Sequence, residues 1–131
     1  MGLHAIICVD VHKCRGGKGM TEIFKALSDL TRLRLLALVW DKEYCVCEFA
    51  ELLEQKQSNV SRHLSILKQA GILERLRQDR HTLYRVSRDF IDGNRNLTGY
   101  LEERFRRELV FRKDRSWQST DLEEPSDGTV C

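Results

Sequence analysis

The sequence lacks any apolar run that approaches the ~20 residues needed to cross a bilayer. Its first residues, MGLHAIICVDVHKC, include a short apolar run without the basic segment that opens a signal peptide. The Met-Gly start also lacks the Ser or Thr of a myristoylation signal. We therefore expect a cytoplasmic protein with no membrane partner, whose five cysteines are mostly reduced thiols.

Acidic residues are missing from one long stretch, between Lys56 and Gly71. Within it, Val60, Leu64 and Leu67 fall on one face of a helix, as they would in any amphipathic core helix. A solvated helix usually carries both charge signs on its other face, whereas a helix that lies against phosphates and base edges excludes carboxylates. The pattern therefore predicts a DNA-recognition helix, ended by a left-handed Gly71. The side chains expected to contact DNA from this helix are Gln57, Ser58, Asn59, Ser61, Arg62 and His63.

The formal net charge of +2 is unevenly distributed along the 131 residues. Residues 56–88 carry eight Lys or Arg against two acids, which indicates a surface for a polyanion. Residues 114–131 carry five acids against one Arg, which we interpret as a disordered acidic tail. Length and composition are those of a single helix-rich domain, small enough for a dimer interface to supply much of its stability.

Three helices are predicted before the recognition helix, at residues 21–27, 31–40 and 45–54. Thr21 would cap the first helix, and Ser28 and Asp29 would end it and cap the second. The second helix is apolar nearly all round, so it should be buried.

The hydrophobic period changes after the recognition helix. Residues 72–76 and 82–86 read as two short strands around a charged turn at residues 78–81, which predicts a hairpin. A helix, a turn, a second helix and a basic hairpin, in this order, form a winged helix-turn-helix. The hairpin residues expected to contact phosphate or the minor groove are Arg77, Arg80 and His81.

A last helix is predicted from about Asp89, with an apolar stripe suited to a two-fold dimer surface. The stripe consists of Leu97, Tyr100, Leu101, Phe105, Leu109 and Phe111. The predicted fold is thus mainly α with a small β-hairpin, as a homodimer. It comprises a flexible arm at residues 1–19 with Cys8 and Cys14, a winged helix-turn-helix domain at residues 20–113 and the tail at residues 114–131.

Four segments, FKALSDLTRLRLLALVW, EYCVCEF, SNVSRHLSILKQAGIL and RHTLYRVS, resemble the ArsR/SmtB family of metal- and metalloid-responsive repressors in their order and spacing. The resemblance covers roughly residues 23–87. It implies a dimeric winged-helix repressor that occupies operator DNA when metal-free and leaves it when the inducer binds. It also implies that EYCVCEF matches the family's ELCVCDL box, so that Cys45 and Cys47 are the thiolate ligands.

The spacing of these two cysteines has its own consequence. Side chains at positions i and i+2 point in nearly opposite directions in a helix or a strand, so two such thiolates can bind one ion only if the backbone is bent or unwound there. We therefore expect ligand binding to distort the start of the helix that braces the recognition helix. Soft thiolates favour As(III), Sb(III), Cd(II), Pb(II), Cu(I) or Zn(II) over hard cations.

Two thiolates are too few for such an ion. Arsenite sensors with a three-cysteine box have a third cysteine where this chain has Ala50, and an arm with a cysteine pair, here Cys8 and Cys14, resembles the cadmium/lead sensors of the family. In those sensors the arm joins the box of the other subunit. Three sulfurs would suit As(III) or Sb(III) as the inducer, whereas four would suit Cd(II), Pb(II) or Zn(II). No organic cofactor is expected.

Several other functions are not supported. The family's zinc site on the last helix is absent, because Arg88 and Phe90 stand where Asp and His are expected and no His follows His81. A thiol enzyme is not expected, because CxC is not the CxxC of a redox motif and no strand-helix-strand pattern surrounds it. A thiol-redox repressor that forms a disulfide among Cys8, Cys14, Cys45 and Cys47 remains an alternative.

Overall fold

The computed structural model describes residues 19–116, with side chains to residue 114. The arm cysteines Cys8 and Cys14 and the rest of the acidic tail lie outside the described residues. The elements in chain order are α1 (Met20–Leu27), α2 (Leu30–Val39), β1 (Tyr44–Cys45), α3 (Val46–Leu52), α4 (Gln57–Gln69), β2 (Leu73–Gln78), β3 (His81–Val86), α5 (Arg88–Gly93), α6 (Arg95–Arg107) and α7 (Leu109–Ser116). Within this part of the chain, no helix combines the length and apolar character needed to cross a membrane.

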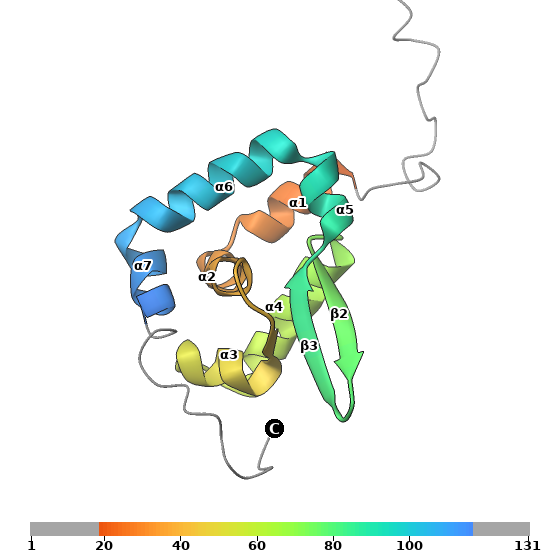
Figure 1. The fold of residues 1–131 in the computed structure, drawn as a ribbon, viewed down its shortest axis with the longest axis vertical. Helices are drawn as coiled ribbons and strands as arrows, with labels where there is room; N and C mark the ends of the chain where they lie inside the picture. Colours follow the sequence, from red (N-terminus) through yellow and green to blue (C-terminus); the bar gives the residue numbers. More distant parts are fainter. Residues whose placement is uncertain (1–18, 117–131) are drawn as a thin grey trace, which may run out of the picture.

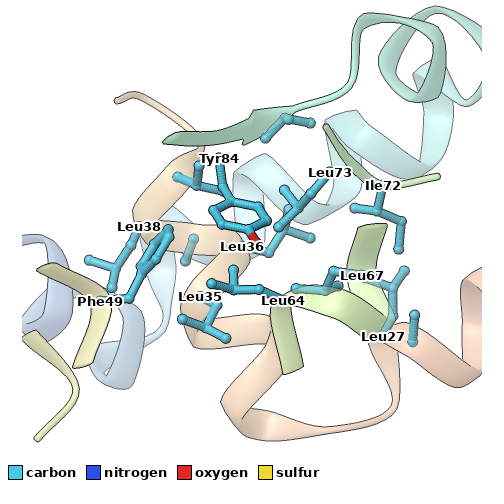
Figure 2. Close-up of a cluster of buried hydrophobic side chains, with 14 of the residues drawn as sticks. Leu27, Leu35, Leu36, Leu38, Phe49, Leu64, Leu67, Ile72, Leu73 and Tyr84 are labelled. Carbon is cyan, nitrogen blue, oxygen red and sulfur yellow. The ribbon is translucent and has the colours of Figure 1, made fainter. Parts of the chain in front are cut away.

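Helix α2 lies at the centre of the fold, seen nearly end-on in Figure 1 with the other helices around it. The Asp29 side chain caps it by accepting the N–H of Arg32 at 3.1 Å, as the sequence predicts. Its residues 35–39 are all buried. Figure 2 shows how Leu35 and Leu36 of α2 meet Leu64 and Leu67 of α4 below Tyr84 of the sheet. Burial of each such Leu stabilises the fold by roughly 1.5–3 kcal/mol.

The predicted hairpin is confirmed, but it belongs to a larger sheet. Strands β2 and β3 pair antiparallel, with Leu73 opposite Val86 and Gln78 opposite His81. Asp79 adopts a positive φ of 53° in the turn, and Gly71 ends α4 with φ 77°, as predicted. The two residues of β1 add a third strand along β3, with Cys45 opposite Leu83. The winged helix-turn-helix is therefore present, and we call the β2–β3 hairpin the wing.

Two predicted helix starts are wrong. Helix α1 begins at Met20 after Gly19, so Thr21 lies inside the helix and its side chain does not cap it. Helix α3 begins at Val46 because Cys45 is still extended, with φ −89° and ψ 168°, and pairs with the wing. The start of α3 is thus set by a tertiary contact, the pairing of Cys45 with Leu83 of the wing.

The predicted last helix is in fact three helices. The backbone leaves the helical conformation at Asn94 and again at Glu108, where ψ is 132°. Helix α7 consequently folds back against α2 (Figure 1), and Phe111 packs edge-to-face on Phe105 with 5.0 Å between ring centroids. Of the expected exposed stripe, Leu101, Phe105 and Phe111 are buried inside one chain, whereas Tyr100 and Leu109 are exposed.

The predicted boundary between domain and acidic tail falls inside α7. Asp114 is 5% exposed, and both of its carboxylate oxygens accept hydrogen bonds from the Arg34 guanidinium at 2.8 Å. These bonds join α7 to the central helix. Asp114 is thus part of the folded domain.

Candidate DNA-binding surface and cysteine site

The outer face of α4 carries the polar side chains expected of a recognition helix. Gln57, Ser58, Ser61 and Arg62 are exposed. Asn59 is half-buried because it is held within the helix: its amide donates to Gln55 Oε1 at 2.7 Å, and its carbonyl oxygen accepts from Arg62 at 3.1 Å. These side chains form a continuous acid-free surface on α4.

His63 differs from this expectation. It is 6% exposed, because it lies three residues after Val60 and four before Leu67 and so shares their buried face. Its Nδ1 accepts a hydrogen bond from Arg32 at 3.3 Å, and Arg32 also donates to the Ala26 carbonyl at 2.6 Å. His63 therefore joins α4 to the α1–α2 junction and is not available to contact DNA.

Burial lowers the pKa of His63 below its ordinary value of 6.5, with the nearby Arg32 and Arg62 charges adding to this effect. The carboxylate of Asp29, 3.9 Å from His63 Nδ1, acts in the opposite direction without reversing the shift. The imidazole is consequently neutral near pH 7, which allows its Nδ1 to accept the Arg32 hydrogen bond.

The wing presents a second cationic surface. Arg77 and Arg80 are exposed near its tip, and His81 is half-buried at the start of β3. Arg85, nearer the base, pairs with Glu74 across the strands and lies 3.8 Å from Glu43. The charge of Arg85 is thus compensated locally. The arginines with the most direct access to a polyanion are those near the tip.

The cysteine box, residues 43–49 (EYCVCEF), spans the junction of β1 and α3. Cys45 is the last strand residue and the N-cap of α3. Its backbone N–H donates to Glu48 Oε2 at 2.8 Å, and the Glu48 N–H points back to the Cys45 side chain, which completes a capping box. The backbone is therefore already bent between Cys45 and Cys47, as binding of one ion by both would require.

A cavity of about 470 Å³ opens at this junction and is lined by three elements. We call it the junction cavity. Cys45 and Cys47 line it from the cysteine box, and the start of α4 and the wing supply the rest of its wall. The full lining is Cys45, Val46, Cys47, Gln57, Ser58, Ser61, Arg80, His81 and Thr82.

The two cysteines differ in state. Cys45 is buried and carries a thiol, whose pKa is raised by burial and by the neighbouring Glu48 carboxylate. Ligation of Cys45 must therefore release a proton near neutral pH. Cys47 is half-buried and disulfide-bonded, so that ligation through its sulfur requires the reduced protein.

Soft sulfur donors fit a thiophilic ion, and both cysteines border the same cavity. Among the described residues, however, no three Cys, His, Asp or Glu side chains come together as they would around a metal ion. His81 borders the cavity without completing such a group. Any third donor must therefore come from elsewhere.

Sequence reasoning missed one contact at this site. The Gln57 side-chain amide donates a hydrogen bond to Cys47 Sγ at 3.2 Å. Gln57 is the first residue of α4 and lies ten positions after Cys47 in the sequence. No periodicity within one helix indicates such a contact, because it depends on how α3 and α4 pack.

Comparison with known proteins agrees with this architecture. A family model described as "Bacterial regulatory protein, arsR family" matches residues 29–75. The chain is 39% identical over 67 residues to the arsenical resistance operon repressor of Escherichia coli K12, covering 50% of this chain and 57% of that protein. It is 39% identical over 69 residues to an uncharacterised HTH-type transcriptional regulator of Methanocaldococcus jannaschii, covering 52% of this chain and 78% of that protein. It is 32% identical over 73 residues to a cadmium resistance transcriptional regulatory protein CadC homologue of Staphylococcus aureus, covering 55% of this chain and 60% of that protein.

The match to the E. coli arsenical repressor thus spans little more than half the length of that relative. Among solved structures, reduced HlyU from Vibrio cholerae superposes with a TM-score of 0.58 at 25% identity, over 68% of this chain and 87% of that one. The similar proteins are transcriptional regulators and not enzymes. Matched in sequence through the recognition helix and in fold through the wing, the chain belongs to the ArsR/SmtB family of winged helix-turn-helix transcriptional regulators.

Proposed function

We propose that this protein is a metal(loid)-sensing transcriptional repressor, which binds operator DNA when metal-free and dissociates when As(III) or Sb(III) binds its cysteine thiolates. The observation that carries the proposal is the junction cavity, where two soft sulfur donors border the same space as the recognition helix and the wing. A change at the cysteines therefore acts directly on both elements that would contact DNA. The names of the E. coli and S. aureus relatives support a resistance repressor.

In the DNA-bound state, α4 would lie in the major groove and the wing would flank it. Gln57, Ser58, Ser61 and Arg62 would face base edges and phosphates, and Asn59 would orient Arg62 through its hydrogen bond. Arg77, Arg80 and His81 of the wing would contact phosphate or the minor groove. Arg85, whose charge is compensated by Glu74 and Glu43, would contribute little to DNA affinity.

The reduced thiols of Cys45 and Cys47 would supply two ligands, and one or both of Cys8 and Cys14 would supply the rest. When bound, a thiophilic ion would link these sulfurs and restrict the geometry of the β1–α3 junction. Cys45 would lose its proton, and the capping box with Glu48 would have to adapt, because the sulfur that accepts the Glu48 N–H is then a ligand. With four sulfurs, the inducer would instead be Cd(II), Pb(II) or Zn(II).

A homodimer would match the two-fold symmetry of such operators. Large apolar side chains remain exposed on α1 and α6, namely Met20 at 72%, Phe24 at 54% and Tyr100 at 57%, and Leu109 of α7 is 70% exposed. Exposure of this kind marks a surface that another protein covers, here a second copy of the chain. Light scattering after gel filtration tests this, with Phe24→Glu expected to shift the protein towards monomer.

The decisive experiment is fluorescence anisotropy of a labelled duplex from the promoter upstream of this gene, with reduced protein. DNA binding should be reversed by As(III), and Cys45→Ser should bind DNA but no longer respond. Cys131→Ser is the matched control and should respond like the wild type. Reversal by Cd(II) alone, lost in both Cys8→Ser and Cys14→Ser, would replace the arsenic assignment with the four-sulfur one. Binding that neither ion reverses would contradict metal sensing.

A thiol-redox repressor is the second candidate, and the disulfide state of Cys47 favours it. Oxidation would fix the position of Cys47 covalently and so alter the same β1–α3 junction. The same anisotropy assay separates the two functions. Reversal by peroxide and restoration by a reductant, with no response to either ion, would establish redox sensing.

A further inference from the structure

The hydrogen bond between Gln57 and Cys47 joins the cysteine box to the recognition helix. Its donor is the Gln57 amide, at the first residue of α4, and its acceptor is the Cys47 sulfur, 3.2 Å away in the first turn of α3. Lys56 caps α4 without a side-chain hydrogen bond, so no local cap fixes the start of this helix. The bond from Gln57 is thus a direct polar link between α3 and the end of α4 that would enter the DNA.

We propose that Gln57 is the positioning residue that couples the state of Cys47 to the DNA affinity of α4. The sulfur accepts the Gln57 N–H in the disulfide-bonded state that the structure describes. We extend this bond to the reduced, ligand-free protein, where it would hold the first turn of α4 against α3. This inference rests on the proposed sensing function, because it assigns the coupling role within the same site.

Ligation opposes this bond for a simple reason. To bind an ion, the sulfur must turn towards the other donors and so away from the Gln57 N–H. Gln57 is exposed, so the release of its N–H changes how the side chain is presented to DNA. The start of α4 then loses a restraint at the residue nearest the cysteine box.

The coupling predicts an effect that does not involve DNA. In the free protein, ligand binding at Cys47 has to break the Gln57 hydrogen bond. A variant without the N–H donor has no such bond to break. Free Gln57→Met should therefore bind As(III) about three- to tenfold more tightly than the wild type, as expected for one hydrogen bond of this kind. The methionine keeps the length of the side chain and removes both N–H groups.

The coupling also predicts a specific pattern in DNA binding. The bond should be strongest in the DNA complex, where contacts to DNA hold the first turn of α4 in place. Gln57→Met should then raise the As(III) affinity of the complex by more than that of the free protein and, by linkage, reduce the ratio of DNA affinities without and with As(III) by about threefold. A residue that only contacts DNA should weaken both states equally and leave the ratio unchanged. Arg62→Ala is the matched control, because Arg62 is exposed on the same helix and its hydrogen bond is to Asn59.

The experiment therefore measures two quantities for the wild type, Gln57→Met and Arg62→Ala, with a phosphine reductant present. The first is As(III) affinity without DNA, followed by ultraviolet absorbance of the arsenic-sulfur bonds. The second is operator affinity by anisotropy with and without As(III). Tighter As(III) binding and a smaller ratio for Gln57→Met alone would support the coupling. Identical As(III) affinities in all three proteins would overturn it, whereas a wild type that does not bind As(III) would instead contradict the proposed function.

Discussion

Replacing Asp114 with alanine removes the carboxylate that holds α7 against α2. In the wild type, Asp114 is almost fully buried and both of its oxygens are bonded to Arg34, whose side chain is 25% exposed. The substitution leaves the guanidinium in place without its partner. Because the pair joins residues eighty positions apart in sequence, its loss should lower the stability of the whole domain.

The expected loss follows from the burial of the two groups. Removing one partner of a fully buried ion pair costs roughly 3–5 kcal/mol, because the remaining charge is left uncompensated. Here the partly exposed Arg34 can be rehydrated, so the free energy of unfolding should fall by about 2–3 kcal/mol. Replacing both partners, as Arg34→Met with Asp114→Leu, should recover most of this loss, since no charge is then left buried.

Urea denaturation followed by far-ultraviolet circular dichroism measures this change. Glu103→Ala is the control, because Glu103 forms an exposed ion pair with Arg107 at 2.7 Å on α6 and its loss should change stability by no more than about 0.5 kcal/mol. Amide exchange of α7 shows whether this helix detaches before global unfolding. If Asp114→Ala proves as stable as Glu103→Ala, the pair does not anchor α7.

Three further results are expected. Arg80→Ala should lower the slope of log affinity against log salt by about one, whereas Arg85→Ala, whose charge is compensated by Glu74 and Glu43, should leave the slope nearly unchanged. The lowered pKa of His63 means that the unfolded chain binds more protons, so stability should rise with pH through the region of pH 6.5 and fall below it. Urea midpoints across this range would measure the trend, which His63→Gln should abolish. The Tyr44 hydroxyl is buried without a hydrogen-bond partner among the described residues, so Tyr44→Phe should maintain or raise the urea midpoint, and a loss above about 1 kcal/mol would contradict this.

The sequence was sufficient to predict the elements whose signal is local. Gly71 at the end of α4 and the strand periodicity of the wing depend on residues close to each other, and both predictions are confirmed. The burial of His63 could also have been predicted, because its spacing from Val60 and Leu67 places it on their face. The acid-free composition of α4 favoured a DNA contact for His63 instead, because a His side chain on a recognition helix can also bind DNA.

Tertiary contacts determine the features that the sequence did not reveal. The two residues of β1 are too few to produce a period, and they become a strand only by pairing with β3. The C-terminal segment reads as one amphipathic helix because its apolar residues keep a helical spacing. It breaks at Glu108 because the chain folds back so that Phe111 reaches Phe105 and Asp114 reaches Arg34.

The short strand β1 explains why a sensor at Cys45 would not need a long pathway to reach the DNA. The Cys45 backbone pairs with Leu83 of the wing, and the same residue caps α3, which packs against α4. A rearrangement of this backbone would therefore shift the wing through β3 and the recognition helix through α3. Each route crosses a single packed interface, and packed interfaces favour discrete alternative arrangements over gradual deformation. We therefore expect substitutions at Leu83, on the wing side, and at Gln57, on the helix side, to reduce the inducer response in part and their combination to reduce it further.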